Sequence, residues 1–208
     1  MVGDYPKPIG ASGRRIGPGG VFLDFGSRNP YNLAMNTISD LARAYHFAAV
    51  RHLNQRRKGK AGEPYINHLT EVADLVAAAT GGGDIDLVIA AVLHDVLEDT
   101  ATTPAELADA FGARVAGIVA EVSDDKTLPK VERKRLQIEH APHLTPEAKT
   151  IKLADKTANL RSIAKSPPAD WDAARIADYI AWAIAVVDGC RGTNAVLEEK
   201  FDEAVRVF

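Results

Sequence analysis

The stretch IAAVLHDVLEDT, residues 89–100, places one imidazole and three carboxylates at the end of an apolar run. On a continuous helix, His94, Asp95, Glu98 and Asp99 would span about 140° of one face. Like charges one turn apart destabilise a helix by roughly 0.2–0.5 kcal/mol per pair, and carboxylates in a last turn oppose the helix dipole by roughly 0.3–1 kcal/mol. A bound divalent cation would offset both costs. A solvated acidic turn explains this stretch equally well when it is taken alone.

Two further residues supply ligand types that such a cation needs. His68, in PYINHLTEVADLVAAA, shares a helix face with apolar residues, where a lone histidine is usually a core residue. Asp155, in IKLADKTANL, would by itself be a surface or ion-paired aspartate. Together with His94 and Asp95 they form a mixed nitrogen and oxygen set, which favours Mn²⁺, Fe²⁺, Zn²⁺ or Mg²⁺. Four protein ligands leave room in an octahedral shell for the water that a hydrolase uses.

Positive charge precedes the first histidine of this set in the segment RRKGK, residues 56–60. Arg57 and Lys58 could bind a polyphosphate, the arginine through two parallel hydrogen bonds, although the spacing also fits a solvated basic loop. Arg175 and Tyr179 are one helical turn apart and could present a guanidinium and a ring to a nucleobase, or form a plain surface pair. The run ERKRLQ, residues 132–137, is predicted to be a charged helix face.

The elements that must position these residues are predicted to be helices. The predicted ranges are 38–54, 64–79, 85–99, 104–111, 113–122, 130–140, 146–163, 170–188 and 194–206. Glycine and proline separate them: GGG at 81–83 ends a helix, TPE at 145–147 opens one, and PP at 167–168 breaks the chain. Because no strand alternation accompanies this pattern, the fold class is all-α, a compact multi-helix bundle over residues 37–208. Residues 1–36, with seven glycines and four prolines in the first thirty, are predicted to form an irregular arm.

Composition excludes several other classes of protein. The 208 residues are 46% hydrophobic and 25% charged, as in an ordinary globular domain. A net charge of −3 gives no global attraction for nucleic acid or for a membrane surface. No apolar run reaches membrane-spanning length. The single cysteine, Cys190, forms no intramolecular disulfide, which predicts a reducing compartment, the cytoplasm.

Longer stretches narrow the class further. The order of His68, His94-Asp95 and Asp155 resembles the HD-domain metal-dependent phosphohydrolases. The stretches QRRKGKAGEPYINH, AAVLHDVLEDT, FGARVAGIVAEVSDDKTLPKVERKRLQ, KLADKTANLRSI and GTNAVLEE closely resemble the Mesh1-type small alarmone hydrolases, stand-alone relatives of the hydrolase domain of Rel/SpoT proteins. The resemblance runs from about residue 40 to residue 205.

This resemblance implies an all-α HD-domain enzyme, a guanosine-3′,5′-bis(diphosphate) 3′-pyrophosphohydrolase. Such an enzyme acts on the stringent-response alarmones ppGpp and pppGpp, uses a metal-activated water to release the 3′-diphosphate as pyrophosphate, and leaves GDP or GTP. The implied cofactor is one Mn²⁺ ion, although the ligand chemistry also admits other divalent metals. The implied metal ligands are His68, His94, Asp95 and Asp155.

The resemblance also implies roles for residues outside the ligand set. Glu98 and Asp99 match the catalytic pair of the family. Arg57 and Lys58 match contacts to the substrate phosphates, and Asn159 matches a contact to the sugar. The remaining implied contacts line the nucleotide pocket and are Lys130, Arg175 and Tyr179.

Two alternatives remain open at this point. Ala158 stands where relatives commonly carry an aromatic residue or a histidine, so another nucleotide with a ribose 2′- or 3′-phosphate is the first alternative substrate. A non-catalytic alarmone-binding module is the second, and the presence of all six ligand and catalytic residues argues against it. The sequence leaves open the oligomeric state, the role of the arm, and which of Glu98 and Asp99 is the general base.

Overall fold

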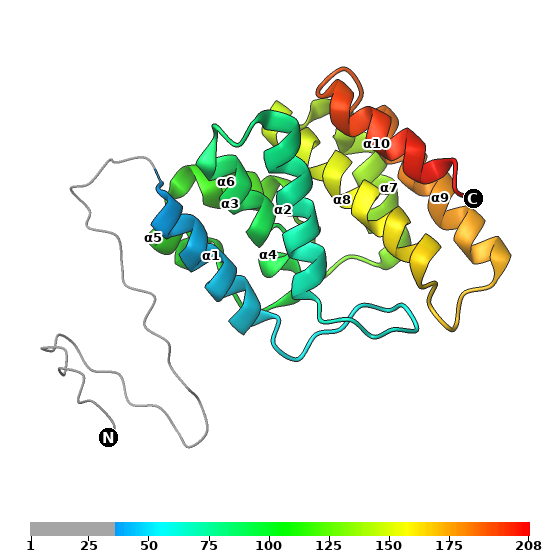
Figure 1. Cartoon of the computed structure of the whole chain (residues 1–208), viewed down its shortest axis with the longest axis horizontal. Helices are drawn as coiled ribbons and strands as arrows, with labels where there is room; N and C mark the ends of the chain where they lie inside the picture. Colours follow the sequence, from blue (N-terminus) through cyan, green and yellow to red (C-terminus); the bar gives the residue numbers. More distant parts are fainter. Residues whose placement is uncertain (1–35) are drawn as a thin grey trace, which may run out of the picture.

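The computed structural model describes residues 36–208, and these are helical over most of their length (Figure 1). The helices are α1 Ile38–Arg51, α2 Ile66–Thr80, α3 Ile85–Leu93, α4 Val96–Asp99, α5 Pro104–Phe111, α6 Ala113–Val122, α7 Lys130–His140, the 3₁₀ turn η1 Ala141–His143, α8 Pro146–Lys165, α9 Ala173–Asp188 and α10 Ala195–Val205. No β-strand occurs among the described residues, so the all-α prediction is confirmed. The predicted arm lies outside the described residues except for Asn36.

Side-chain caps explain where several helices begin. Thr37 and Asp40 form a reciprocal capping box at α1, and Thr145 accepts from the backbone of Ala148 at α8, where the sequence predicted a start. Asp84 and Asn194 cap α3 and α10 in the same way. Because each such cap contributes about 1 kcal/mol, polar residues at these positions fix the helix boundaries well.

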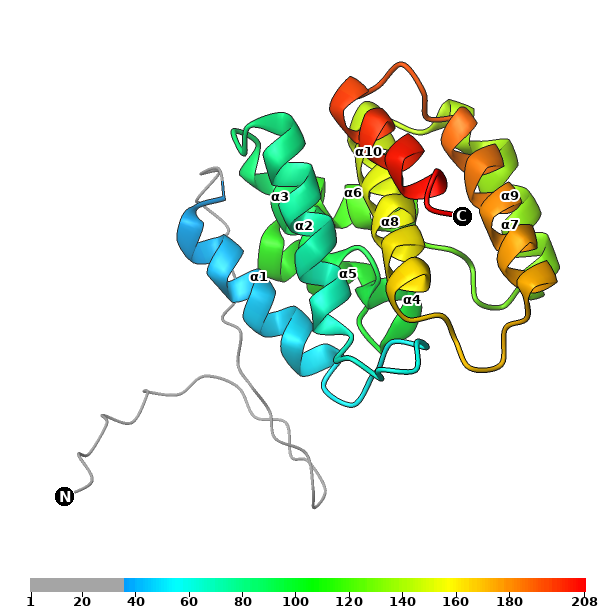
Figure 2. The ribbon, with the colours of Figure 1, turned by 45° about the vertical axis from the view of Figure 1, so that its right-hand side comes forward.

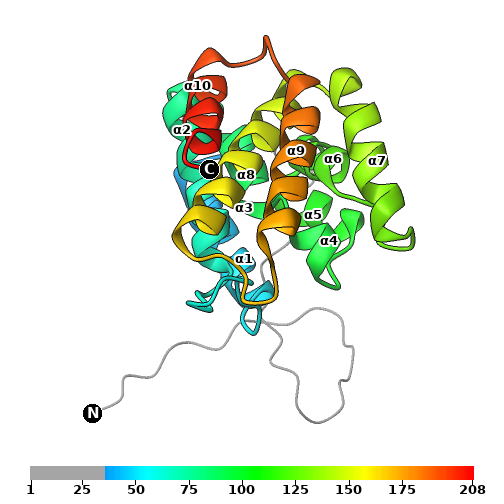
Figure 3. The same ribbon diagram turned by 90° about the vertical axis from the view of Figure 1, so that its right-hand side faces the viewer.

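The core is built around α3 and α8, each of which packs against several other helices. Every residue of α3 from Leu87 to Leu93 is buried, and this helix packs against α1, α2 and α6. Helix α8 contacts α2, α6, α9 and α10, and Figure 2 shows it between the α2 side and the paired α7 and α9. Helices α7 and α9 run side by side and form an outer wall, which faces the viewer in Figure 3. None of the helices within residues 36–208 combines the length and apolar character needed to cross a lipid bilayer.

The continuous helix predicted over 85–99 is wrong. Helix α3 ends at Leu93, His94 and Asp95 form a turn, and α4 begins at Val96. Asp95 departs from helical geometry with φ −99° and ψ −3°, and its carboxylate accepts a 2.7 Å hydrogen bond from the Tyr65 hydroxyl. This tertiary contact accompanies the break, which no glycine or proline marks. The acidic residues of α4 therefore stand in a separate single turn, and the dipole cost expected for one long helix does not apply.

Candidate active site

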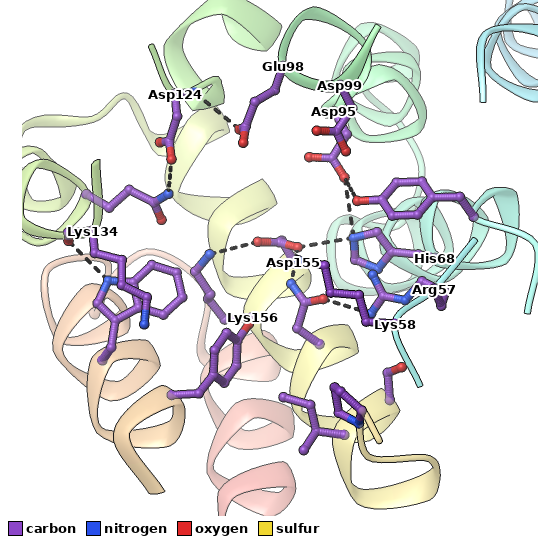
Figure 4. Close-up of a pocket in the computed structure, with 18 of the residues that line it drawn as sticks. Arg57, Lys58, His68, Asp95, Glu98, Asp99, Asp124, Lys134, Asp155 and Lys156 are labelled. Carbon is purple, nitrogen blue, oxygen red and sulfur yellow. Dashed lines mark hydrogen bonds and ion pairs between the residues drawn. The ribbon is translucent and has the colours of Figure 1, made fainter. Parts of the chain in front are cut away.

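Two histidines and two aspartates converge where α2, the α3–α4 turn and α8 meet. Figure 4 shows His68, Asp95 and Asp155 pointing toward one another from these elements. His68 Nε2 lies 3.2 Å from Asp155 Oδ1 and 3.6 Å from Asp95 Oδ2. His94 Nε2 lies 3.1 Å from Asp95 Oδ2 and 3.8 Å from Asp155 Oδ1. The structure thus brings together all four residues of the predicted ligand set.

The chemistry of this cluster fits a divalent metal ion. His94 Nδ1 lies 2.8 Å from the carbonyl oxygen of Ala91, so Nδ1 carries the hydrogen and the lone pair of Nε2 faces the aspartates. That Nε2 is buried and has no hydrogen-bond partner among the described residues. The ligand atoms of His68, His94 and Asp155 lie within 4.8 Å of one another, and Asp95 faces both histidines from outside this group of three. Two imidazoles and two carboxylates around one point are a donor set that suits a divalent cation.

The electrostatics of the cluster also favour a cation. Burial lowers the pKa of His68. Burial lowers the pKa of His94 as well, but the charges of Asp95 and Asp155 outweigh it and raise that pKa to about 9. The raised pKa indicates that the two aspartates create a strongly negative potential at His94, which favours a positive charge at this point.

Outer partners hold the carboxylate of Asp155 in place. Lys156 Nζ donates to Asp155 Oδ2 at 2.9 Å, and Asn159 Nδ2 donates to Oδ1 at 2.6 Å. Arg57 in turn donates to Asn159 Oδ1 at 2.8 Å. Such contacts orient a ligating group and restrict its rotation. Asn159, predicted to meet the sugar, here joins the basic loop to the ligand cluster.

Glu98 and Asp99 stand on α4 beside the ligand cluster. Glu98 Oε2 accepts from the backbone N–H of Asp124 at 3.3 Å. Lys126 Nζ lies 3.2 Å from Glu98 Oε1 and 2.8 Å from Asp99 Oδ1. Burial, followed by the charges of Asp95 and Asp124, raises the pKa of Glu98 against the opposing effect of Lys126. A carboxylate with a raised pKa beside a ligand cluster is well suited to accept a proton from water.

A cleft of about 580 Å³ opens onto these residues. All twelve sequence-predicted site residues line it. Its basic residues come from the 56–60 loop, the loop after α6, and helices α7, α8 and α9, and are Arg56, Arg57, Lys58, Lys126, Lys130, Arg133, Lys134, Lys152, Lys156 and Arg175. Such a lining suits a ligand that carries several negative charges.

The α7–α9 wall of the cleft combines positive charge with aromatic rings. Lys134 Nζ lies 4.5 Å from the ring centre of Trp182, and the rings of Tyr179 and Trp182 are 5.3 Å apart. Neither Lys130 nor Lys134 lies within ion-pair distance of a carboxylate in the described part of the chain. Partial burial, followed by the charge of Lys58, lowers the pKa of Lys130. Lys130 and Lys134 therefore place positive charge on the wall that no carboxylate among the described residues pairs with, whereas Arg175 pairs with Asp170 at 3.2 Å.

Several cleft residues were missed by sequence reasoning. Tyr65 precedes His68 by three residues, a helical spacing that could have indicated its role beside the ligands. Lys126 lies in the stretch DDKTLP, residues 124–129, and Lys156 directly follows Asp155. Their positions in the cleft depend on how the loop after α6 and the α7–α9 pair pack, which periodicity does not specify.

Ala158 has a different environment from the one expected. Its side chain is fully buried in the core and does not line the cleft. A small residue at position 158 therefore does not enlarge the pocket directly. This finding weakens the sequence argument for another substrate.

Gly59 lets the basic loop approach the end of α8. A Cβ at this position would collide with the carbonyl oxygen of Ser166, and the Ser166 hydroxyl accepts from the backbone of Ala61 at 3.0 Å. Because Gly59 follows Arg57 and Lys58, the G59A variant is expected to displace the loop and weaken the phosphate contacts that the resemblance implies for these two residues. KM for the implied substrate should then rise about tenfold, with a smaller effect on kcat. Steady-state kinetics, which give KM and kcat separately, measure the two effects.

The matched control for G59A is G83A, because a Cβ on Gly83 meets nothing within 4 Å. G83A should keep the wild-type KM. A G59A protein with wild-type KM would mean that close docking of the loop on α8 is not needed for substrate binding.

Comparisons with known proteins match this fold and site. A family model described as HD domain matches residues 44–181. The guanosine-3′,5′-bis(diphosphate) 3′-pyrophosphohydrolases MESH1 of Danio rerio and Homo sapiens are 50% and 51% identical to the chain, over 78% and 77% of its length and 91% and 90% of theirs. A solved structure described as a metazoan ortholog of SpoT that hydrolyses ppGpp superposes with a TM-score of 0.79 at 43% identity, covering 83% of this chain and 97% of that one.

An all-helical bundle with a histidine–aspartate cluster of this geometry defines the HD-domain class of proteins. The chain belongs to the HD-domain family and, within it, to the Mesh1-type group of Rel/SpoT hydrolase-domain relatives.

Proposed function

We propose that the protein hydrolyses ppGpp and pppGpp at the 3′-diphosphate, giving GDP or GTP and pyrophosphate, with one Mn²⁺ ion as cofactor. The observation that carries the proposal is that four metal-ligand side chains, two carboxylates and a basic lining meet in one cleft. The curated MESH1 relatives are named for this activity. The buried single cysteine, Cys190, is consistent with action in the cytoplasm.

The ligand cluster is assigned to the metal ion. His68, His94, Asp95 and Asp155 would hold it, and when bound it supplies a Lewis acid that polarises a phosphate oxygen and acidifies water. Mn²⁺ suits a set of two nitrogen and two oxygen donors, although Fe²⁺, Zn²⁺ and Mg²⁺ share that preference in part.

The two α4 carboxylates divide their tasks. Glu98 is the better general base, because its raised pKa brings it closer to neutrality. Asp99 is tied to Lys126 and Gln55 and so acts by fixing the position of the attacking water. When water attacks the phosphorus attached to the ribose 3′-oxygen, Glu98 takes one proton from it and the P–O3′ bond breaks. Pyrophosphate is released, and the 3′-oxygen takes up a proton from solvent to become a hydroxyl.

The basic lining is assigned to the substrate. Arg57 and Lys58 lie beside the ligand cluster and bind the 3′-diphosphate. Lys130 and Arg175 on the α7–α9 wall carry charge for the remaining phosphates, and Tyr179 offers a ring to the base. Asn159 reaches the sugar from α8.

A panel of nucleotides with and without metal tests the proposal. Protein stripped of metal should leave ppGpp intact, and added Mn²⁺ should restore release of pyrophosphate, because the ligand cluster needs a cation for chemistry. The panel includes pppGpp and nucleotides with a single 2′- or 3′-phosphate, and product separation identifies the bond that breaks. If ppGpp survives while another phosphate ester disappears, the alternative substrate replaces this one. If ppGpp binds and nothing is cleaved, the protein is a binding module.

A further inference from the structure

Asp99 is held by two neighbours of different character. Lys126 Nζ reaches its Oδ1 at 2.8 Å, but this lysine is 45% exposed and also contacts Glu98. Gln55 Nε2 donates to Asp99 Oδ2 at 2.7 Å and contacts no other carboxylate among the described residues. The orientation of Asp99 therefore depends mainly on how firmly Gln55 is fixed.

The side chain of Gln55 has its orientation set by His52. A glutamine amide offers a carbonyl oxygen at one corner and an N–H₂ at the other, so it can turn end for end unless its partners decide. His52 Nδ1 lies 2.6 Å from Gln55 Oε1, and a carbonyl oxygen only accepts. Nδ1 must then carry the hydrogen, and the N–H₂ of Gln55 is directed to the carboxylate of Asp99. This is the assignment that satisfies both ends of the pair.

His52 itself is held firmly. Its side chain is buried, and its ring stacks on Tyr65 with centroids 5.2 Å apart and 20° between the planes. The backbone adds two bonds, from the Gln55 N–H to the His52 carbonyl at 2.9 Å and from the Tyr65 N–H to the Gln55 carbonyl at 3.1 Å. The hydroxyl of the same tyrosine binds the ligand Asp95. One stacked pair of rings thus holds a metal ligand directly and Asp99 through Gln55.

We propose that His52 and Gln55 are positioning residues, which act in series to hold Asp99 at a fixed place beside the metal ligands. This inference rests on the proposed function, in which Asp99 acts at the reacting phosphate. Neither residue needs to touch the substrate for this role. Their loss should therefore lower kcat and leave KM and metal binding close to those of the wild type.

Two substitutions at Gln55 separate positioning from packing. Q55M keeps the length of the side chain and removes the donor, so kcat should fall about tenfold to a hundredfold, as for a lost hydrogen bond to a charged group. Q55E has nearly the shape of glutamine but faces Asp99 with a second carboxylate, so its kcat should fall at least as far. A packing role predicts the opposite order, with Q55E closer to the wild type than Q55M.

A double-mutant cycle tests the serial arrangement. H52F keeps a ring to stack on Tyr65 and removes the Nδ1 hydrogen, so kcat should fall by less than in Q55M, because the amide still reaches Asp99 but is no longer held. Since His52 acts through Gln55, the H52F/Q55M protein should have a kcat within about twofold of Q55M alone. If the two losses multiply, His52 does not act through Gln55 and the series is wrong.

Kinetics, metal content and circular dichroism of the wild type and of the four variants, Q55M, Q55E, H52F and H52F/Q55M, complete the test. N54A is the matched control, because Asn54 is an exposed neighbour in the same loop and should leave kcat unchanged. The assay uses whichever panel nucleotide the wild type hydrolyses. A substrate other than ppGpp would therefore overturn the proposed function and leave the positioning role of His52 and Gln55 open to the same test. Gln55 is partly exposed, and its two variants decide the matter even if H52F fails to fold. Wild-type kcat in a folded, metal-loaded Q55M protein would overturn the proposal.

Discussion

Replacing Asp95 with asparagine is expected to remove metal binding and activity together. Asparagine has the same shape and keeps an oxygen to accept the Tyr65 hydroxyl, but it lacks the negative charge that faces both histidines. A bound ion contributes several kcal/mol of charge stabilisation at the reacting phosphate, so hydrolysis should fall about 10³-fold or more. Elemental analysis after loading with Mn²⁺ and the steady-state rate measure the two effects.

Asp95 is a better target than Asp155 for this purpose. Lys156 is buried and pairs with Asp155 at 2.9 Å, so removing that aspartate would leave a buried ammonium without its carboxylate. Such a loss destabilises a protein by about 3–5 kcal/mol and would mix unfolding with loss of metal. D95N has no comparable cost, because Tyr65 and the backbone of α4 keep their partners.

The control for D95N is D109N, which removes an exposed carboxylate on α5. Because a ligand that binds only the folded state raises its stability, Mn²⁺ should raise the melting temperature of the wild type and of D109N but not of D95N. A D95N protein that holds Mn²⁺ and hydrolyses at the wild-type rate would remove Asp95 from the ligand set.

The helices were largely predictable because their ends carry local chemical signals. Thr145 and the glycines at 81–83 fix boundaries through caps and backbone conformation, which depend on neighbouring residues alone. The break at His94 and Asp95 was not predictable in this way. It coincides with a hydrogen bond between Asp95 and Tyr65, thirty residues earlier, so its stabilisation is tertiary.

The candidate site was also predictable only in part. The proposed ligand set followed from residue types and order, since histidine and aspartate are costly to bury without a purpose. The basic wall did not, because ERKRLQ has charge on every side of α7. Arg135 turns outward to Glu132 and Glu139, whereas Lys134 turns inward to line the cleft. Only the packing of α7 against α9 decides which side faces the substrate.

Replacing Glu98 with glutamine is expected to separate catalysis from metal binding. The amide keeps the length of the side chain and can still accept from the backbone of Asp124, but it cannot take a proton from water. General-base assistance contributes about 10²–10⁴ in rate, so kcat should fall by that factor while the Mn²⁺ content stays at the wild-type level. Rapid quenching of single turnovers measures the chemical step directly.

The thermal stability of E98Q provides an independent test, because the direction of its change follows from the pKa of Glu98. The pKa of Glu98 is raised in the folded protein by burial and by Asp95 and Asp124, so its ionised form is disfavoured there relative to the unfolded chain. An acid whose pKa rises on folding opposes folding once pH exceeds its ordinary range, and glutamine removes that penalty at neutral pH. The melting temperature of E98Q should therefore equal or exceed that of the wild type. The control is E199Q on the exposed face of α10, which should change neither kcat nor the melting temperature. An E98Q protein with wild-type kcat would transfer the role of general base to Asp99, and one that loses Mn²⁺ would place Glu98 among the ligands.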